Sequence, residues 1–365
     1  MKISAINICA ATFLATIAVS FGATNTWVAN VPAGAAWSNA ANWSAGVIPA
    51  TNDTALFTNT QSTTYAVDIS GTAAAGGLTL SKSYTFDGTG ALDLRGNSAS
   101  SIAFVYNSAA VTSTFNTAVN VDQAGTSAGS YATFSSVAGG KIIFNNTIKS
   151  TGTVGPVNLT RNVDFNGDID LATRFRMNTG AGNNQIVTIG GSGTTRSTIN
   201  WILTGDLTLN LNRTGAYTTD DRYMNVELAR VYLGAVNALA AGTNIRFRNA
   251  GYGMVAQGFD QDFGWLDVDA ATTFDMGGSK SVWTFADSSS ATTVWAGTTL
   301  TVTNAENATI RFSIDSANSG TGLSAAQIGK IVLDGKTLTP GDTRIKNGYL
   351  YITPQRAKLG IFIVS

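Results

Sequence analysis

The chain of 365 residues contains no histidine. Histidine is the commonest general base, the commonest zinc ligand and the middle member of Ser-His-Asp triads, so its absence argues against ordinary hydrolase chemistry. The only cysteine, Cys9, lies in the N-terminal apolar segment, and the remainder of the chain therefore has no disulfide or thiol chemistry. Catalysis by carboxylate, lysine, arginine or tyrosine side chains stays open. Because histidine and thiol chemistry are both missing, we expect a protein that is not an enzyme and needs no cofactor.

Charge is also scarce, since charged residues make up 12% of the chain and the 22 basic and 22 acidic residues cancel. This balance provides no electrostatic surface for nucleic acid or anionic lipid, so neither partner is expected. Only Glu227 and Glu306 are glutamates. Threonine, serine, asparagine and glycine must fill the solvent-facing positions, and these residues suit strands and turns. Composition thus predicts an all-β protein.

No apolar run is long enough for a stable transmembrane anchor, although the N-terminus is apolar. The strongly apolar part, Ile8 to Phe21, is shorter than the roughly 20 residues that span a bilayer. Lys2 precedes it, and Ser20-Phe21-Gly22 is a small-x-small cleavage site for signal peptidase. Residues 1–23 are therefore predicted to be a signal peptide, and the mature protein to be exported.

Short segments with alternating apolar residues run along the chain and end in Gly, Asn, Asp or Ser. They are Thr64–Ile69, Leu78–Leu80, Tyr84–Phe86, Ala91–Leu94, Ile102–Tyr106, Val119–Val121, Lys141–Phe144, Val157–Leu159, Val163–Phe165, Ile186–Ile189 and Ile199–Leu211. Such regular strand and turn spacing predicts a sandwich, a barrel or a solenoid. The pairs Phe115-Asn116, Phe144-Asn145 and Phe165-Asn166 repeat an aromatic before a turn, which favours a β-solenoid over the alternative of β-sandwich domains.

One short helix is predicted within Gly322–Lys330. Ser324 as N-cap and Gln327 three residues later form a capping box. We expect this helix to belong to a C-terminal cap that shields the last strand edge.

The N-terminal aromatic pattern and a central segment carry a family resemblance. The residues are Trp27, Trp37-Ser38-Asn39, Asn42-Trp43, Gly46, Pro49, Asp53, Ala55 and Phe57, then Leu233–Thr243, Gly258–Gln261 and Leu266. They resemble bacterial proteins with autotransporter-associated β-strand repeats. This resemblance implies a right-handed parallel β-helix on an exported surface or secreted polypeptide.

The C-terminal part resembles proteins with a PEP-CTERM sorting signal. The matching segments are Trp295–Leu300, Gly322–Ile331, Tyr351–Pro354 and Leu359–Ile363. The resemblance implies sorting to the envelope or an extracellular polysaccharide matrix. Two departures stand out: Pro354-Gln355-Arg356 replaces Pro-Glu-Pro, and Leu359–Ser365 is too short to cross a bilayer, so free secretion and a truncated gene product stay open.

These observations predict five regions along the chain. They are a signal peptide (1–23), an aromatic N-terminal cap (24–60), a β-solenoid body (61–295), a C-terminal β cap with one short helix (296–353) and a degenerate sorting tail (354–365).

Two sets of residues are candidates for ligand contact. Trp27, Trp37 and Trp43 could stack on sugar rings, although such rings more often plug the first coil of a solenoid. The aspartates of three Asp-x-Asp pairs would lie about 6.6–6.8 Å apart on one strand face, which overlaps the carboxyl spacing of inverting glycosidases. Those pairs are Asp168/Asp170, Asp260/Asp262 and Asp267/Asp269.

Alternative interpretations of the aspartates and arginines are less specific. Asp260, Asp262, Asp267 and Asp269, with Asp275 nearby, could bind a structural calcium ion, but no EF-hand or calcium β-roll motif is present. The pairs Arg174/Arg176 and Arg246/Arg248 could bind acidic sugars or neighbouring aspartates. Solvated surface acids and solubilising arginines are the simpler interpretation.

The sequence therefore predicts a secreted or cell-surface structural or adhesive β-helix of a bacterial envelope or extracellular matrix. Its expected partners are extracellular polysaccharide, other envelope proteins or further copies of itself. A polysaccharide-binding, lyase or glycosidase β-helix is the alternative, because one fold can host both functions.

Overall fold

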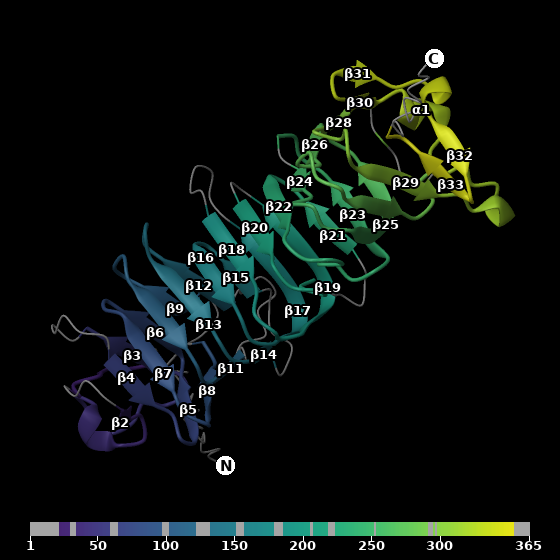
Figure 1. Cartoon of the computed structure of the whole chain (residues 1–365). Coiled ribbons are helices and arrows are strands. Elements are labelled where there is room, and N and C mark those ends of the chain that lie inside the picture. The colour runs from purple at the N-terminus through teal and green to yellow at the C-terminus, as the bar shows by residue number, and fades with distance from the viewer. Residues whose placement is uncertain are drawn as a thin grey trace, which may run out of the picture.

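The chain winds into stacked parallel β-coils (Figure 1). The computed structural model describes residues 22–29, 34–58, 65–96, 102–121, 132–150, 157–178, 185–204, 207–217, 223–251, 253–290, 295 and 298–353. The predicted signal peptide, apart from residues 22 and 23, and the predicted tail 354–365 lie outside these residues. The all-β solenoid prediction is confirmed, and the β-sandwich alternative is wrong.

One face of the solenoid is a 14-stranded sheet, here called the front sheet. Its strands are β2 (Ala35–Ala36), β4 (Tyr65–Asp68), β7 (Tyr84–Asp87), β10 (Thr112–Phe115), β13 (Lys141–Phe144), β16 (Asn162–Phe165), β18 (Gln185–Ile189), β20 (Leu207–Leu211), β22 (Ala229–Leu233), β24 (Gly253–Val255), β26 (Thr272–Asp275), β28 (Leu300–Thr303), β30 (Ile331–Leu333) and β31 (Lys336–Thr337). All neighbours pair in parallel except β30 and β31, which form an antiparallel hairpin.

The remaining strands form a 19-stranded sheet that bends around the rest of each coil. They are β1 (Thr24–Thr26), β3 (Thr54–Phe57), β5 (Thr72–Ala75), β6 (Gly77–Leu80), β8 (Ala91–Leu94), β9 (Ile102–Asn107), β11 (Ala118–Val121), β12 (Ala132–Ser136), β14 (Ile148–Ser150), β15 (Val157–Leu159), β17 (Ile169–Asn178), β19 (Thr195–Thr204), β21 (Tyr223–Val226), β23 (Thr243–Phe247), β25 (Gln261–Val268), β27 (Val282–Phe285), β29 (Thr309–Ser313), β32 (Arg344–Lys346) and β33 (Tyr349–Tyr351). The long strand β17 pairs with both β14 and β15, so it turns a corner of the coil.

Side chains alternate between the core and the surface along these strands, as in β3, β8, β11, β13 and β16. This period of two follows from the pleat of an extended chain. Inward aliphatic and aromatic side chains from successive coils form one continuous hydrophobic core. The alternation read from sequence therefore identified the core face directly.

The repeated aromatic position becomes a ladder of stacked phenylalanines. The rings of Phe86, Phe115, Phe144 and Phe165 follow one another with centroids 4.7, 5.2 and 5.3 Å apart and nearly parallel planes. The repeat spacing seen in the sequence is thus the length of one coil. Each ring covers the next and is excluded from water, which stabilises the interface between coils.

An amide ladder follows the same register at the neighbouring turn. Asn116 donates from Nδ2 to Asp87 at 2.6 Å, and Asn145 and Asn166 each donate to the asparagine before it at 2.8 Å. All three bonds run toward the N-terminus and end on the Asp87 carboxylate. The Asn-led turns of the sequence therefore stack as the phenylalanines do.

Both ends of the solenoid are closed by chain that runs against the coil direction. At the N-terminus, Trp27 and Trp43 form an antiparallel bridge beside the 3₁₀ helix η1 (Ala40–Asn42). At the C-terminus, β33 pairs antiparallel with both β29 and β32. Two further 3₁₀ helices, η2 (Ser316–Asn318) and η3 (Pro340–Asp342), lie in this end.

The predicted helix is confirmed as α1 (Ala325–Ile328), with the Ser324–Gln327 capping box formed in both directions. Gln327 also donates to the carbonyl of Ser288 at 2.7 Å, which ties the helix to the segment after β27. One predicted strand is corrected, because the segment 199–211 is divided between β19 and β20. Its continuous apolar pattern spans two faces of one coil, and periodicity alone does not show where the chain turns.

Candidate functional site

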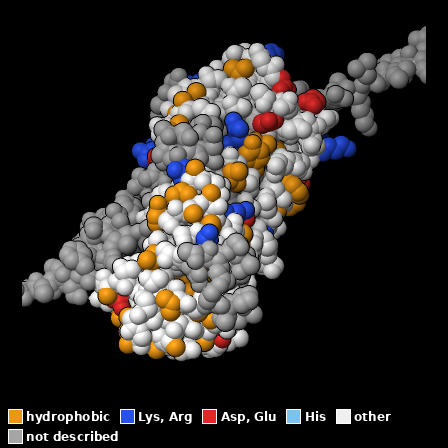
Figure 2. All heavy atoms as spheres, turned by 90° about the vertical axis from the view of Figure 1, so that its left-hand side faces the viewer, with side chains coloured by type: hydrophobic (Ala, Val, Ile, Leu, Met, Phe, Trp, Pro, Cys, Tyr) orange, Lys and Arg blue, Asp and Glu red, His pale blue; other side chains and the backbone are white. Residues whose placement is uncertain are grey.

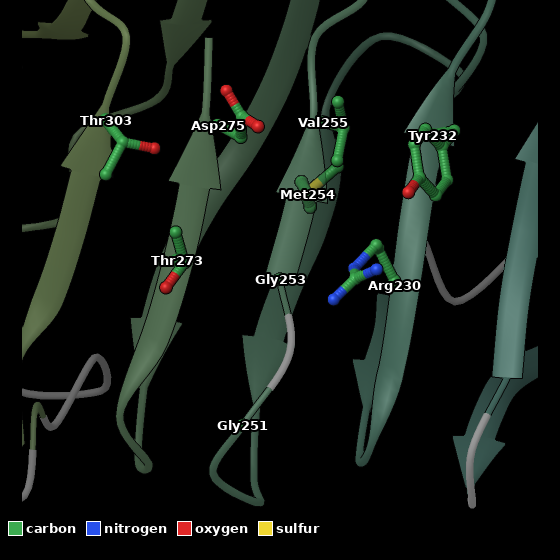
Figure 3. Close-up of a pocket in the computed structure, with 9 residues that line it drawn as sticks. All are labelled: Arg230, Tyr232, Gly251, Gly253, Met254, Val255, Thr273, Asp275 and Thr303. Carbon is green, nitrogen blue, oxygen red and sulfur yellow. The ribbon is translucent and has the colours of Figure 1, made fainter. Parts of the chain in front are cut away.

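A groove of about 400 Å³ lies on the outer surface of the front sheet, across β22, β24, β26 and β28. Register places Tyr232, Val255, Asp275 and Thr303 in one outward row. Arg230 lies two residues before Tyr232 on β22, and Gly253 and Thr273 pair in the row that Arg230 begins. Figure 3 shows Arg230 extending from β22 beside Gly253, with Thr273, Asp275 and Thr303 on the strands beyond.

The groove exists because Gly253 contributes no side chain to its row. A Cβ at this position would lie 1.7 Å from the carbonyl oxygen of Thr273, so the two backbones pack too closely for any other residue. Met254 faces the core beneath, while Arg230 is exposed and Tyr232 is half-buried. The result is a depression with a cation and an aromatic ring at one end, and hydroxyl groups and a carboxylate at the other.

Asp275 is held in a defined orientation at the edge of the groove. Its Oδ1 accepts hydrogen bonds from the Gly277 amide at 2.9 Å and from Asn304 Nδ2 at 2.8 Å. The two bonds fix the carboxylate at the end of β26. A fixed acceptor beside threonine hydroxyls can bind hydroxyl donors of a polar ligand.

A second cluster of ionisable groups lies on β23 and β25. Arg246 Nε is 3.2 Å from Asp267 Oδ2, and Arg246 Nη2 is 2.7 Å from Asp269 Oδ2. Asp267 is only 2% exposed, and burial together with the neighbouring Asp269 carboxylate raises its pKa to about 6, while Arg246 opposes the rise. This aspartate has the pKa of a general acid, but its burial keeps it from a polymeric substrate.

The three tryptophans of the N-terminal pattern form the plug of the first coil, which the sequence favoured over a sugar platform. Trp27, Trp37 and Trp43 are each 2% exposed. Trp43 packs edge-on against Trp27 at 4.9 Å and against Trp37 at 4.7 Å, and all three rings contact Phe57. Their faces are covered by one another, so the carbohydrate-contact prediction is corrected to a structural role.

The predicted calcium cluster does not converge. Asp260 accepts from the Val282 amide at 2.7 Å and Asp262 is exposed, whereas Asp267 and Asp269 share Arg246. Within the part of the chain that the structure describes, no three His, Cys, Asp or Glu side chains group closely enough to hold a metal ion. Register explains the outcome, because a sequence cluster that crosses a corner of the coil is spread over two faces.

The pair Asp168/Asp170 does not form an acid–base pair either. Asp168 lies at the corner before β17, where it accepts from the Thr194 amide at 2.6 Å and from the Thr194 hydroxyl at 3.0 Å. These bonds hold its pKa below the ordinary value, whereas Asp170 is exposed on β17. An aspartate with a lowered pKa is a poor general acid, so this pair does not support glycosidase chemistry.

The predicted arginine pairs have separate outcomes. Arg246 binds Asp267 and Asp269, and Arg248 lies 3.6 Å from Glu227, so both neutralise neighbouring acids. The side chains of Arg174 and Arg176 lie outside the described residues. Arg213, which the sequence did not single out, is buried and donates to the carbonyls of Gly167, Gly190 and Thr194 and to the Thr195 hydroxyl. It binds three successive coils together.

No protein-family model, curated protein or solved structure matches the chain. Among the described residues, no helix has the length and apolar character needed to cross a membrane. The autotransporter-associated and PEP-CTERM resemblances therefore stay predictions.

Sequence reasoning missed the groove, although one of its residues, Asp275, had been considered for calcium. Arg230 and Tyr232 lie two residues apart on one strand, and Gly251 and Gly253 stand just before and at the start of β24. Such residues are common on surface strands and do not by themselves indicate a binding site. Only the register of four coils brings their side chains together in one groove.

Proposed function

We propose that this protein is an exported structural or adhesive β-solenoid that contacts polysaccharide or other envelope molecules of a bacterial surface or extracellular matrix. The observation that carries the proposal is the uninterrupted stack of coils, closed at both ends, with a mostly uncharged surface. In Figure 2 the charged side chains of the visible face are few and scattered among uncharged ones. Such a body provides a long, rigid surface for neutral hydrogen bonding.

The predicted signal peptide and the tail resemblance support export. End-to-end filaments are not part of the proposal, because the chain runs antiparallel at the Trp27–Trp43 bridge near one end and in β33 at the other, which interrupts the parallel repeat. The terminal strand β32 is exposed and carries Arg344 and Lys346, and charged residues on an edge discourage strand addition. Lateral contact with other molecules is the remaining mode of association.

An enzymatic alternative has one observation in its favour, which is the raised pKa of Asp267 beside Arg246. Its burial counts against that alternative, since a catalytic acid must lie within hydrogen-bond distance of the substrate. The groove residues Asp275 and Arg230 belong to β26 and β22, and these two strands lie about 9.6 Å apart by ordinary strand spacing. The two side chains therefore start from backbones too far apart to form a tight catalytic pair. The structural or adhesive function is therefore preferred.

The test is to incubate the full-length protein with acidic and neutral polysaccharides, and to measure both retention of the protein on the polysaccharide and cleavage of the polysaccharide. We expect the protein to be retained without the release of new reducing or unsaturated ends. Cleavage that disappears in Asp267→Asn or Asp275→Asn would replace the proposal by the enzymatic alternative. Retention in a cell-surface or culture-medium fraction of the native host should accompany binding, whereas a cytoplasmic protein would contradict export.

A further inference from the structure

We propose that the groove across β22 to β28 binds an extended segment of an acidic polysaccharide, aligned with the solenoid axis, with a carboxylated sugar beside Arg230. This inference rests on the proposed function, because it names the ligand of the same adhesive surface. Three observations carry it: the hollow made by Gly253, the chemistry of its two ends, and the repeat of its rows.

The repeat of the rows matches an extended glycan. Successive strands of a sheet lie about 4.8 Å apart, which is close to the length of one pyranose unit in an extended chain. The groove crosses four strands, so it spans about 14 Å along the axis and has room for roughly three sugar units. Each unit would span the step from one coil to the next, with the outward positions of Tyr232, Val255, Asp275 and Thr303 as successive contacts.

The charges give the ligand a direction. Arg230 presents a planar guanidinium, which suits a carboxylate, and Tyr232 two residues later offers a ring face for the apolar side of the same sugar. Asp275 repels a carboxylate but accepts hydroxyl groups, and its Oδ1 contacts keep it in place. The acidic unit is therefore placed over β22 and hydroxyl-rich units over β26 and β28.

Threonine hydroxyl groups and one apolar side chain complete the groove. Thr273 and Thr303 lie beyond Gly253 on β26 and β28, and each can donate and accept (Figure 3). The half-exposed Val255 gives the floor an apolar contact between the two polar ends. A mixture of one aromatic ring, a small apolar floor and oriented polar groups is suited to a sugar, whose faces are apolar and whose rim is polar.

The experiment measures binding of the full chain to deacylated gellan, in which neutral sugars separate the carboxylated ones, and to neutral dextran and dextran sulfate. Arg230→Ala should weaken gellan binding on the order of tenfold, since a hydrogen bond to a charged group contributes that much. Tyr232→Ala should weaken it similarly, and Tyr232→Phe should retain binding because the ring face remains. Matched controls are Arg196→Ala, an exposed arginine on β19, and Tyr106→Ala, an outward tyrosine on β9. Both should bind as the unsubstituted chain does.

The outcomes separate this inference from the proposed function. Unchanged gellan binding in both Arg230→Ala and Tyr232→Ala would overturn the groove as the binding site while leaving an adhesive protein. Equal binding to dextran sulfate would overturn carboxylate recognition in favour of ion exchange. If the unsubstituted chain binds none of the three polymers, the groove inference fails. The proposed function is then decided by the acidic and neutral polysaccharides of the test given above. Equal melting temperatures of variants and controls show that a loss of binding is not a loss of fold, and Arg230→Lys serves as a milder variant.

Discussion

Substitution of Phe144 tests the idea that the stacked rings stabilise the interfaces between coils. Phe144 is 1% exposed and lies in the middle of the ladder. It stacks on Phe115 at 5.2 Å and on Phe165 at 5.3 Å, and it meets Phe134 edge-on at 5.2 Å. Phe144→Ala therefore opens a cavity and removes contacts to two neighbouring coils at once.

The expected loss in free energy of unfolding is about 4 kcal/mol for Phe144→Ala, from the usual cost of truncating a buried phenylalanine. Phe144→Leu keeps most of the volume but loses the aromatic contacts, so it should cost about 2 kcal/mol. Ile143→Ala, the adjacent outward position on β13, is the control and should cost less than about 1 kcal/mol.

Urea unfolding followed by far-ultraviolet circular dichroism measures these differences, and hydrogen exchange locates them. Because each coil contacts only its neighbours, protection should fall most in β10, β13 and β16. A cost for Phe144→Ala as small as that of Ile143→Ala would refute the reasoning, as would loss of protection spread evenly over all coils.

Three further predictions follow from buried groups. Arg213→Met should lower the free energy of unfolding on the order of 3 kcal/mol, because it removes the hydrogen bonds to carbonyls of the two preceding coils. The exposed Arg196→Met should have little effect, and equal urea midpoints for the two variants would contradict this role. The folded state holds a proton on Asp267 that the unfolded state releases, so its contribution to stability is complete below the ordinary pKa of 3.8 and is lost as pH rises through about 6. Asp267→Asn should abolish this pH dependence, so the difference in urea stability between the two proteins should change as pH rises from the ordinary pKa of 3.8 to about 6. Parallel pH profiles of the two proteins would contradict the raised pKa. Trp43→Ala should destabilise the first coil by about 4 kcal/mol without changing polysaccharide retention, since its ring packs on Trp27, Trp37 and Phe57; a selective loss of retention at unchanged stability would restore the sugar platform.

The confirmed parts of the fold are those that depend on local chemistry. The alternation in segments such as 141–144 and the repeated Phe-Asn pairs predicted strands and stacked coils, because both follow from a period of two and from turn residues. The capping box of Ser324 and Gln327 predicted α1 for the same reason, since its two hydrogen bonds lie within one turn of chain.

The candidate sites depended on neighbours that are distant in sequence, and there the sequence was less informative. Spacing grouped Asp260, Asp262, Asp267 and Asp269, but a corner within β25 separates Asp260 and Asp262 from the pair that binds Arg246. Aromatic character suggested sugar contact for Trp43, whereas the rings around it cover its faces. Burial and partner choice are properties of the coil stack, which no local pattern specifies.

The sequence by itself determined an all-β chain of stacked coils with neutral outward rows, because composition, alternation and turn residues act within a few residues of one another. The groove was decided only by tertiary structure. Arg230, Gly253, Asp275 and Thr303 come from four coils, and the missing side chain of Gly253 leaves the hollow between them. Inter-coil register, set by the length of each turn, is the physical reason that these residues meet.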